Sequence, residues 1–275
     1  MKNLFDQNPR SFSLNAFLVT ALICATLPRI HADPQVVRYA QGSYHGFLEL
    51  LSPDGQVVAL GDSTQVVRGD RVTSQTTFTF KDGSTDEETT VFSQHSIFQL
   101  ISEHHIQKGP FFPHPMAVFV DARGGEFITR TAGKDGKEEV KASHVQLPND
   151  LANGMVPLVV ENMSPGDSSK TISMVVAAPN PLVAKLVISK IGEDNYSLVG
   201  TARKAIHYEV KIQLGGVVGF VAPLIGKAPP NIEIWTVPGQ PPTFVREQGP
   251  IYPDGPVMTI QLVSPTWPDA TKPAG

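Results

Sequence analysis

The sequence has little cysteine and little charge, and each shortage excludes a class of protein. Cys24 is the only cysteine among the 275 residues, so the chain can form neither an internal disulfide nor a metal site with several thiolates. Charged residues make up 17% of the chain, and the net charge at pH 7 is −4. A weakly acidic chain lacks the basic surface that nucleic acid binds. We therefore expect no nucleic-acid partner.

Catalytic signatures are missing as well. The chain contains no G-x-S-x-G turn, no H-E-x-x-H pair and no glycine-rich loop with the spacing of a nucleotide-binding site. Those motifs place a nucleophile, a zinc ion or a phosphate group on a defined turn or helix. Without them we predict no catalytic residue, no cofactor and no bound metal.

A group of histidines is the strongest remaining metal candidate. Close together in the sequence, and beside Glu103, lie His95, His104, His105 and His114. Adjacent residues of a strand point to opposite faces, so His104 and His105 cannot serve one site. We predict one long strand over residues 89–106, along which His95 and His105 stand about 33 Å apart. The histidines are therefore expected to be polar residues near a strand end.

Two carboxylate pairs leave a hydrolase open as the alternative function. Glu87 with Glu88, or Asp121 with Glu126, could flank a glycosidic bond if the two carboxyl groups stood about 5–10 Å apart. An exported hydrolase of glycans or esters is therefore the first alternative. A purely structural envelope protein is the second.

No apolar run is long enough to span a membrane. Residues Ala16–Leu27 are mainly apolar, follow the basic residues Lys2 and Arg10, and end at Pro28, whereas a spanning helix needs about 20 apolar residues. This order of features is typical of a secretory signal. We predict that residues 1–32 are a signal peptide cleaved near Ala32. The mature protein would be periplasmic or secreted and would have no transmembrane segment.

Alternation of apolar and polar residues is the strongest positive signal. From Ala205 to Leu214 every second residue is apolar, which is typical of a half-buried strand. The same period occurs over residues 171–176, 182–189 and 258–262, and turn sequences such as Pro53-Asp54-Gly55 punctuate the chain. The pattern predicts a mainly β fold, a curved antiparallel meander that forms an incomplete, half-open β-barrel with one or two short helices.

The expected domain organisation is simple. Residues 33–265 would form a single β-rich domain, and the proline-rich residues 266–275 a loose tail. We expect a turn at Gly192–Asn195. Asn149-Asp150 would cap a first helix, and residues 216–226 could form a second helix or an apolar loop.

Three features of the sequence carry a family resemblance. They are the strand rhythm from Gly42 to about Pro265, the segment Gln146–Leu151 that would enter an inner helix, and the segment Gly215–Pro230 followed by Ile232-Glu233-Ile234-Trp235. In these features the chain resembles uncharacterised secreted bacterial families of unknown function whose sheet curls into an incomplete barrel, similar to the lipoprotein-carrier half-barrel. The resemblance implies an architecture and a hydrophobic concavity, and it implies no activity.

The apolar segment of residues 215–227 directs the functional hypothesis. It is apolar on every side, so it would either plug the open side of the sheet or line a lipid-binding cavity. We predict non-catalytic binding of an apolar molecule, such as a lipid or an acyl chain, or of an envelope protein. The candidate binding residues are Val218, Phe220, Leu224, Lys227, Trp235, Phe244 and Arg246.

Overall fold

The structure is a computed structural model that describes residues 35–133, 136–176, 181–198, 201–214 and 230–263. The predicted signal peptide, the predicted tail and the apolar segment 215–227 lie outside these residues. In chain order the elements are β1 (Gln35–Val36), β2 (Tyr44–Leu51), β3 (Val57–Arg68), β4 (Arg71–Phe80), β5 (Thr85–Gln94), β6 (Ile97–Lys108), β7 (Met116–Asp121), β8 (Glu126–Ala132), β9 (Glu138–His144), α1 (Val156–Glu161), β10 (Ser169–Val176), β11 (Leu182–Leu198), β12 (Thr201–Leu214), β13 (Ile232–Val237), β14 (Thr243–Pro250) and β15 (Val257–Val263).

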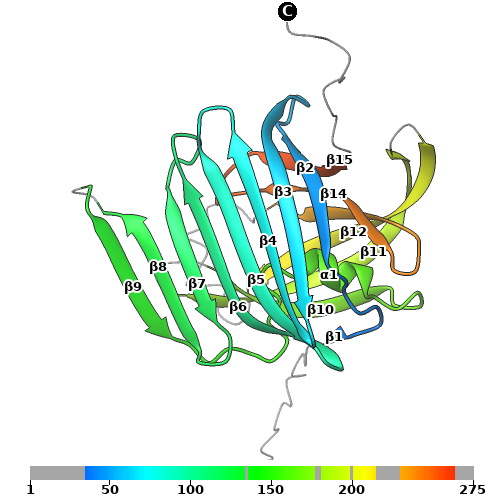
Figure 1. The fold of residues 1–275 in the computed structure, drawn as a ribbon, viewed down its shortest axis with the longest axis horizontal. Coiled ribbons are helices and arrows are strands. Elements are labelled where there is room, and N and C mark those ends of the chain that lie inside the picture. Colours follow the sequence, from blue (N-terminus) through cyan, green and yellow to red (C-terminus); the bar gives the residue numbers. More distant parts are fainter. Residues whose placement is uncertain (1–34, 134–135, 177–180, 199–200, 215–229, 264–275) are drawn as a thin grey trace, which may run out of the picture. The chain divides into compact units, whose positions relative to one another are not determined.

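All of these strands belong to one antiparallel sheet (Figure 1). The main path of the sheet runs from β10 to β15 and continues from β2 to β9, while β1 pairs with β6. The chain therefore forms two meanders, which are joined where β15 pairs with β2. Because β10 and β9 end the path without pairing with each other, the sheet is not closed into a barrel. This confirms the predicted mainly β, half-open architecture.

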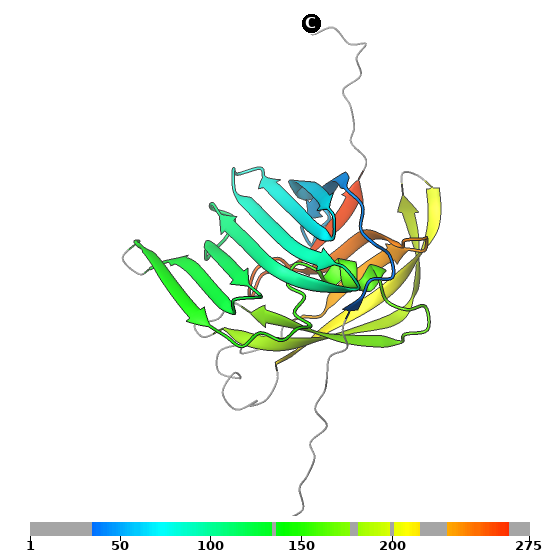
Figure 2. The same ribbon diagram turned by 60° about the horizontal axis from the view of Figure 1, so that its bottom comes forward.

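A buried apolar core holds the sheet bent around α1. Leu158 and Val159 of α1 belong to the same cluster as Val120 of β7, Leu186 of β11 and Ile234 of β13. Figure 2 shows α1 between the part of the sheet that contains β7 and the part that contains β11 and β13. Burial of such side chains stabilises the bend by roughly 1.5–3 kcal/mol for each residue. The concave face of the sheet is therefore the face that holds α1.

A second apolar cluster closes one end of the concave face. It contains Phe78 and Phe80 of β4, Met258 of β15 and, from the loop after β6, Phe112. The Nε2 group of Gln107 on β6 donates a hydrogen bond of 2.6 Å to the carbonyl oxygen of Ile251. Since Ile251 lies in the turn between β14 and β15, this bond ties the two meanders together across the concave side.

The structure corrects three local predictions. The helix begins at Val156, after Met155 as its N-cap, and not at Asn149-Asp150. Residues 89–106 are not one strand, because a turn at His95-Ser96 separates β5 from β6. Residues Gly192–Asn195 are not a turn but continue β11, with a register shift between Lys190 and Gly192. A two-residue turn without glycine or proline leaves no sequence signal, and a bulge can absorb a glycine inside a strand.

Among the described residues, no helix is long and apolar enough to cross a membrane.

Candidate functional site

Polar residues form two rows across the concave face of β3 to β6. In the first row Ser63 pairs with Thr76, Thr76 with Glu88, and Glu88 with His105. In the second row Gln65, Ser74, Thr90 and Glu103 follow one another in the same way. Directly opposed residues of neighbouring strands share a face. The interior of the half-barrel is therefore polar here. These rows lie between the core around α1 and the second apolar cluster, which we call the aromatic cluster because it contains Phe78, Phe80 and Phe112.

Acidic residues concentrate at the β5–β6 side of these rows. The carboxyl groups of Glu88 and Glu103 are neighbours. Oδ1 of Asp86 lies 2.6 Å from Nε2 of His105, and Oδ2 of Asp86 accepts a 2.9 Å hydrogen bond from Gln107. Glu247 of β14 adds a further carboxyl group whose charge interacts with Glu88. We call Asp86, Glu88, Glu103, His105 and Glu247 the acidic cluster.

Burial changes the protonation of the three glutamates. Burial, together with the nearby charge of Glu88, raises the pKa of Glu103 to about 8. Burial and the same neighbour raise the pKa of Glu247 to about 7. The pKa of Glu88 is raised chiefly by burial, against the favourable charge of His105. A carboxyl group removed from water and placed beside like charges holds its proton.

The pKa of His105 is also raised, but for a histidine this favours the charged form. Burial disfavours its charged form, but the hydrogen bond and charge of Asp86, with the charges of Glu88 and Glu103, outweigh burial and raise its pKa to about 9. His105 and Asp86 therefore form an internal ion pair. The same positive charge lies near Glu88 and Glu103 and opposes the rise of their pKa.

Several side chains of the acidic cluster are partly exposed to solvent although protein surrounds them. The side chains of His105 and Asp86 remain 24% and 12% exposed, and Glu88 and Glu247 are likewise only partly buried. Burial is nevertheless the largest cause of the raised pKa of both glutamates. A group can be enclosed and still accessible when it lies on the wall of a crevice. The acidic cluster therefore lies inside the concavity of the curved sheet, which we call the recess.

The loop before α1 packs against this recess. A Cβ atom at Gly154, whose φ is +65°, would overlap Oγ1 of Thr90 and Oε1 of Glu88. The side chain of Asn153 lies beside Glu103 and hydrogen-bonds both backbone groups of Val175 on β10, each at 2.9 Å. The loop thus connects the acidic cluster to the free edge of β10.

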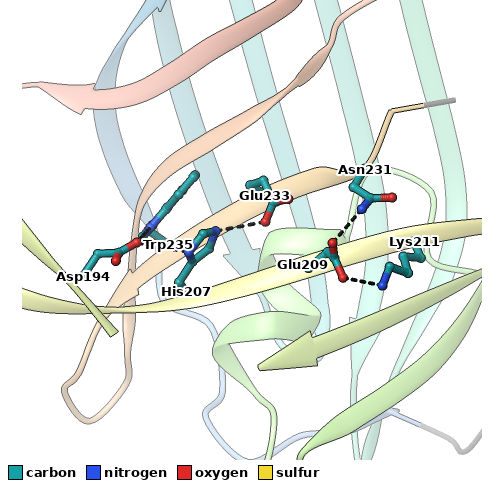
Figure 3. A network of polar contacts seen from close by, with 7 residues as sticks. All are labelled: Asp194, His207, Glu209, Lys211, Asn231, Glu233 and Trp235. Atoms are coloured by element: carbon teal, nitrogen blue, oxygen red, sulfur yellow. Dashed lines mark hydrogen bonds and ion pairs between the residues drawn. The ribbon is translucent and has the colours of Figure 1, made fainter. Parts of the chain in front are cut away.

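A different polar network lies on the convex face (Figure 3). Nδ1 of His207 is 3.0 Å from Asp194 and Nε2 is 2.9 Å from Glu233. The ring of His207 stacks on Trp235 with 4.1 Å between centroids, and Nε1 of Trp235 donates a 2.8 Å hydrogen bond to Asp194. Both ring nitrogens of His207 therefore contact carboxylates of the network itself. We assign this network a structural role in joining β11, β12 and β13.

Comparisons with known proteins assign no family to the chain. No family model and no curated protein matches the chain. Among solved structures, the chain is similar to a β-barrel-like protein of the domain of unknown function DUF1849 from Brucella abortus. The TM-score is 0.42 and the identity 7%, over 84% of this chain and 98% of that chain.

The predicted binding residues do not come together as one described site. Trp235 and Arg246 pair with each other, and Trp235 is buried in a separate small cluster with Val245. Phe244 pairs with Thr236 instead and packs against the core around α1, on the concave face. Val218, Phe220, Leu224 and Lys227 lie outside the described residues. Ligand binding by these residues stays a prediction.

The histidines that lie close together in the sequence do not form one site in the structure. His95 lies in the β5–β6 turn beside Asp70, while His104 packs against Phe119 on the face opposite to His105. Among the described residues, no three His, Cys, Asp or Glu side chains are placed to hold a metal ion. Glu87 faces away from Glu88 and pairs with Lys108 at 3.1 Å. The fold places Glu88 beside Glu103 and not beside Glu87. The other predicted pair, Asp121 with Glu126, does lie on directly opposed positions of β7 and β8.

The sequence analysis missed Glu103 and Glu247 as partners of Glu88. A partial signal was present, because Asp86, Glu88 and Thr90 have the same parity as Phe92, which the structure buries. Residues of one parity share one face of a strand. The pairing of β5 with β6 contains a register shift at Val91/Phe92, and Glu247 comes from the other meander. The alternation of faces within one strand reveals neither the register between two strands nor the approach of a residue from the other meander.

Proposed function

We propose that the protein is an exported envelope protein that binds a small molecule on the concave face of its half-barrel and does not catalyse a reaction. The observation that carries the proposal is the acidic cluster inside the recess, of which Asp86, Glu88, His105 and Glu247 keep part of their surface accessible. Enclosed recesses with a few convergent polar groups are the usual sites of small ligands.

The surroundings of the recess favour a ligand with an apolar part. Partly buried apolar residues flank the polar rows, with Met116 and Phe244 beside the core around α1 and with Ile260 and Tyr252 beside the aromatic cluster. An acyl or alkyl chain would gain free energy by covering such side chains. This supports the expectation of a lipid-like ligand and adds a polar group that the ligand would place at the acidic cluster.

Glycan hydrolysis fits the site less well. Glycosidases hold two carboxyl groups about 5–10 Å apart so that the sugar fits between them. The carboxyl groups of Glu88 and Glu103 instead adjoin each other, which leaves little room for a glycosidic bond between them. We therefore favour binding over hydrolysis.

Native mass spectrometry of protein purified gently from the cell envelope tests the proposal. We expect the wild type to carry one small molecule per chain, released on organic extraction. Thr76→Trp should fill the recess, because Thr76 faces the concave side between Ser63 and Glu88. The matched control is Thr77→Trp, one residue along β4 and on the convex face, which should stay loaded.

The same preparation tests export, since N-terminal sequencing should find the mature chain starting near Asp33. Thermal unfolding shows whether each variant is folded, and Thr76→Leu offers a smaller change if the tryptophan is not tolerated. A wild type without any bound molecule, or equal loading of the Thr76 and Thr77 variants, would contradict binding on the concave face.

A further inference from the structure

Arg246 of β14 is held by two aromatic rings and has no carboxylate partner. Its guanidinium carbon lies 5.2 Å from the ring centroid of Tyr196 and 5.8 Å from that of Trp235. Among the described residues, the side chain forms no hydrogen bond or ion pair, and its Nε atom is buried without an acceptor. The two terminal amino groups have no acceptor either, but they keep accessible surface. Arg246 is therefore a positioned cation with unused donors.

A β-bulge sets the position of Arg246. The pairing of β13 with β14 has a register shift between Trp235 and Thr236, which makes Val245 the extra residue of β14. Bulges re-aim side chains and are over-represented beside functional sites. The hydroxyl of Tyr196 donates a 3.2 Å hydrogen bond to the carbonyl oxygen of Val245, and both residues belong to one small buried cluster. The bulge thus fixes Arg246 against packed rings.

A second arginine without a partner neighbours Tyr196. Arg203 of β12 lies directly opposite Tyr196 of β11, so the two side chains share one face, with Cβ atoms about 5 Å apart. Arg203 is exposed, and its side chain forms no hydrogen bond or ion pair within the described part of the chain. Because Arg203 and His207 have the same parity on β12, this is the convex face. Two unpaired arginines therefore adjoin one aromatic ring on that face.

The neighbouring carboxylates are engaged elsewhere. Asp194 and Glu233 both contact the ring of His207 (Figure 3). The residue opposite Arg246 on β15 is Gln261, which is uncharged. The described part of the chain thus supplies no counter-ion to Arg246, and an anion from outside would meet both charge and free donors.

We infer that Arg246 and Arg203 bind a phosphate group on the convex face. A guanidinium group binds a carboxylate or a phosphate through two parallel hydrogen bonds. One such fork occupies both oxygens of a carboxylate, whereas a phosphate has three acceptor oxygens and up to two negative charges. A phosphate can therefore serve both arginines at once. The site lies on the face opposite to the recess, and it is independent of the ligand proposed there.

Isothermal titration with inorganic phosphate tests the inference on the full-length mature protein, in a buffer without other oxyanions. We expect saturable binding of one phosphate per chain, which weakens as sodium chloride is added because salt screens the attraction. The fluorescence of Trp235 should change on binding, with Trp267→Phe as background, because Arg246 lies against its ring. Sodium acetate should bind about tenfold more weakly than phosphate, since it engages a single fork.

Variants of the two arginines identify the site. Arg246→Gln should weaken phosphate binding about tenfold or more, and Arg246→Lys should also weaken it, because a lysine keeps the charge but loses the fork. Arg203→Gln should weaken binding several-fold, and since Arg203 is exposed this variant tests the site even if changes at Arg246 disturb the fold. The matched control is Arg130→Gln, at an exposed arginine paired with Glu138 at 3.2 Å, which should bind phosphate as the wild type does. Circular dichroism confirms that each variant is folded.

Vesicles distinguish the two sources of a phosphate group. Cosedimentation with phosphatidylcholine vesicles that contain phosphatidic acid, if lost in Arg246→Gln, would assign the group to a lipid headgroup, whereas binding of free phosphate without cosedimentation would assign it to a soluble phosphate ester. No saturable binding of phosphate, equal binding of acetate, or wild-type affinity in both Arg246→Gln and Arg203→Gln would overturn the phosphate site. Each of these results would leave binding in the recess untouched.

Discussion

At the scale of single residues, the protein keeps acidic side chains in an environment that resists their charge. Glu103 is 7% exposed and lies beside Glu88. Its folded-state pKa is about 8, so the folded chain holds a proton that the unfolded chain has already released near neutral pH. Folding stability must then fall as the pH rises from the unfolded pKa of Glu towards about 8. His105, with its pKa raised to about 9, changes stability in the same direction, because its ion pair with Asp86 is lost as the pH rises through that value.

Glu103→Gln should weaken this pH dependence. An amide keeps the shape of the protonated carboxyl group and has no proton to lose. We expect similar stability to the wild type at about pH 5 and a gain of up to about 4 kcal/mol at about pH 8. Urea unfolding across this range measures the effect. The control Glu139→Gln, at an exposed ion pair with Lys141, should run parallel to the wild type, and a parallel course for Glu103→Gln would refute the burial argument.

At the scale of elements, both ends of the sheet are protected, which explains why it can remain open. The loop before α1 covers the free edge of β10, because Ala152 donates to Ser173 at 2.9 Å and Ser173 donates to Asp150 at 3.2 Å. At the other end, β9 is exposed along its length and carries charged residues such as Glu138 and Lys141. Covered or charged edges do not pair with other chains. The half-barrel therefore needs no closing strand.

Asn153→Ala should loosen the edge of β10. The amide side chain satisfies both the N–H and the carbonyl oxygen of Val175, which is buried. Loss of both bonds should cost about 2–4 kcal/mol and speed amide exchange at Val175. Hydrogen exchange read by mass spectrometry measures the second effect. The control Asn195→Ala, at an exposed position of β11, should leave exchange in β10 unchanged, and an equal change in both variants would count against a role for the loop.

At the scale of the whole molecule, one core joins the two meanders. Phe127 of β8 and Ile234 of β13 belong to the same buried cluster although they come from different meanders. The pairing of β15 with β2 adds a second connection. A shared core makes the unfolding of its parts cooperative. The two meanders should therefore unfold together.

Phe127→Ala tests this cooperativity. Phe127 is 2% exposed, and replacing a buried phenylalanine with alanine costs about 3–5 kcal/mol. We expect the loss to appear equally in the fluorescence of Trp235, on the distant β13, and in far-UV circular dichroism, with Trp267→Phe as background. The control Val140→Ala, at an exposed position of β9, should change stability little. A fluorescence transition that does not move would show that the meanders unfold separately.

The strands were predictable because their signal is local. Alternation over residues 205–214, 171–176 and 258–262 anticipated β12, β10 and β15, since each side chain needs only its own neighbours to show which face it takes. The turn at Pro53-Asp54-Gly55 was equally local. The β5–β6 turn was missed because His95-Ser96 contains no residue with a special backbone preference.

The acidic cluster was decided by the tertiary structure. Glu88 and Glu103 meet because of the register between β5 and β6, and Glu247 joins them because the pairing of β15 with β2 and the bend around α1 bring the second meander across the concave face. The sequence by itself determined a mainly β chain with half-buried strands, since side-chain periodicity is a property of each strand alone. Register and curvature depend on residues far apart in the chain, and they determine which side chains meet and which of them keep a proton.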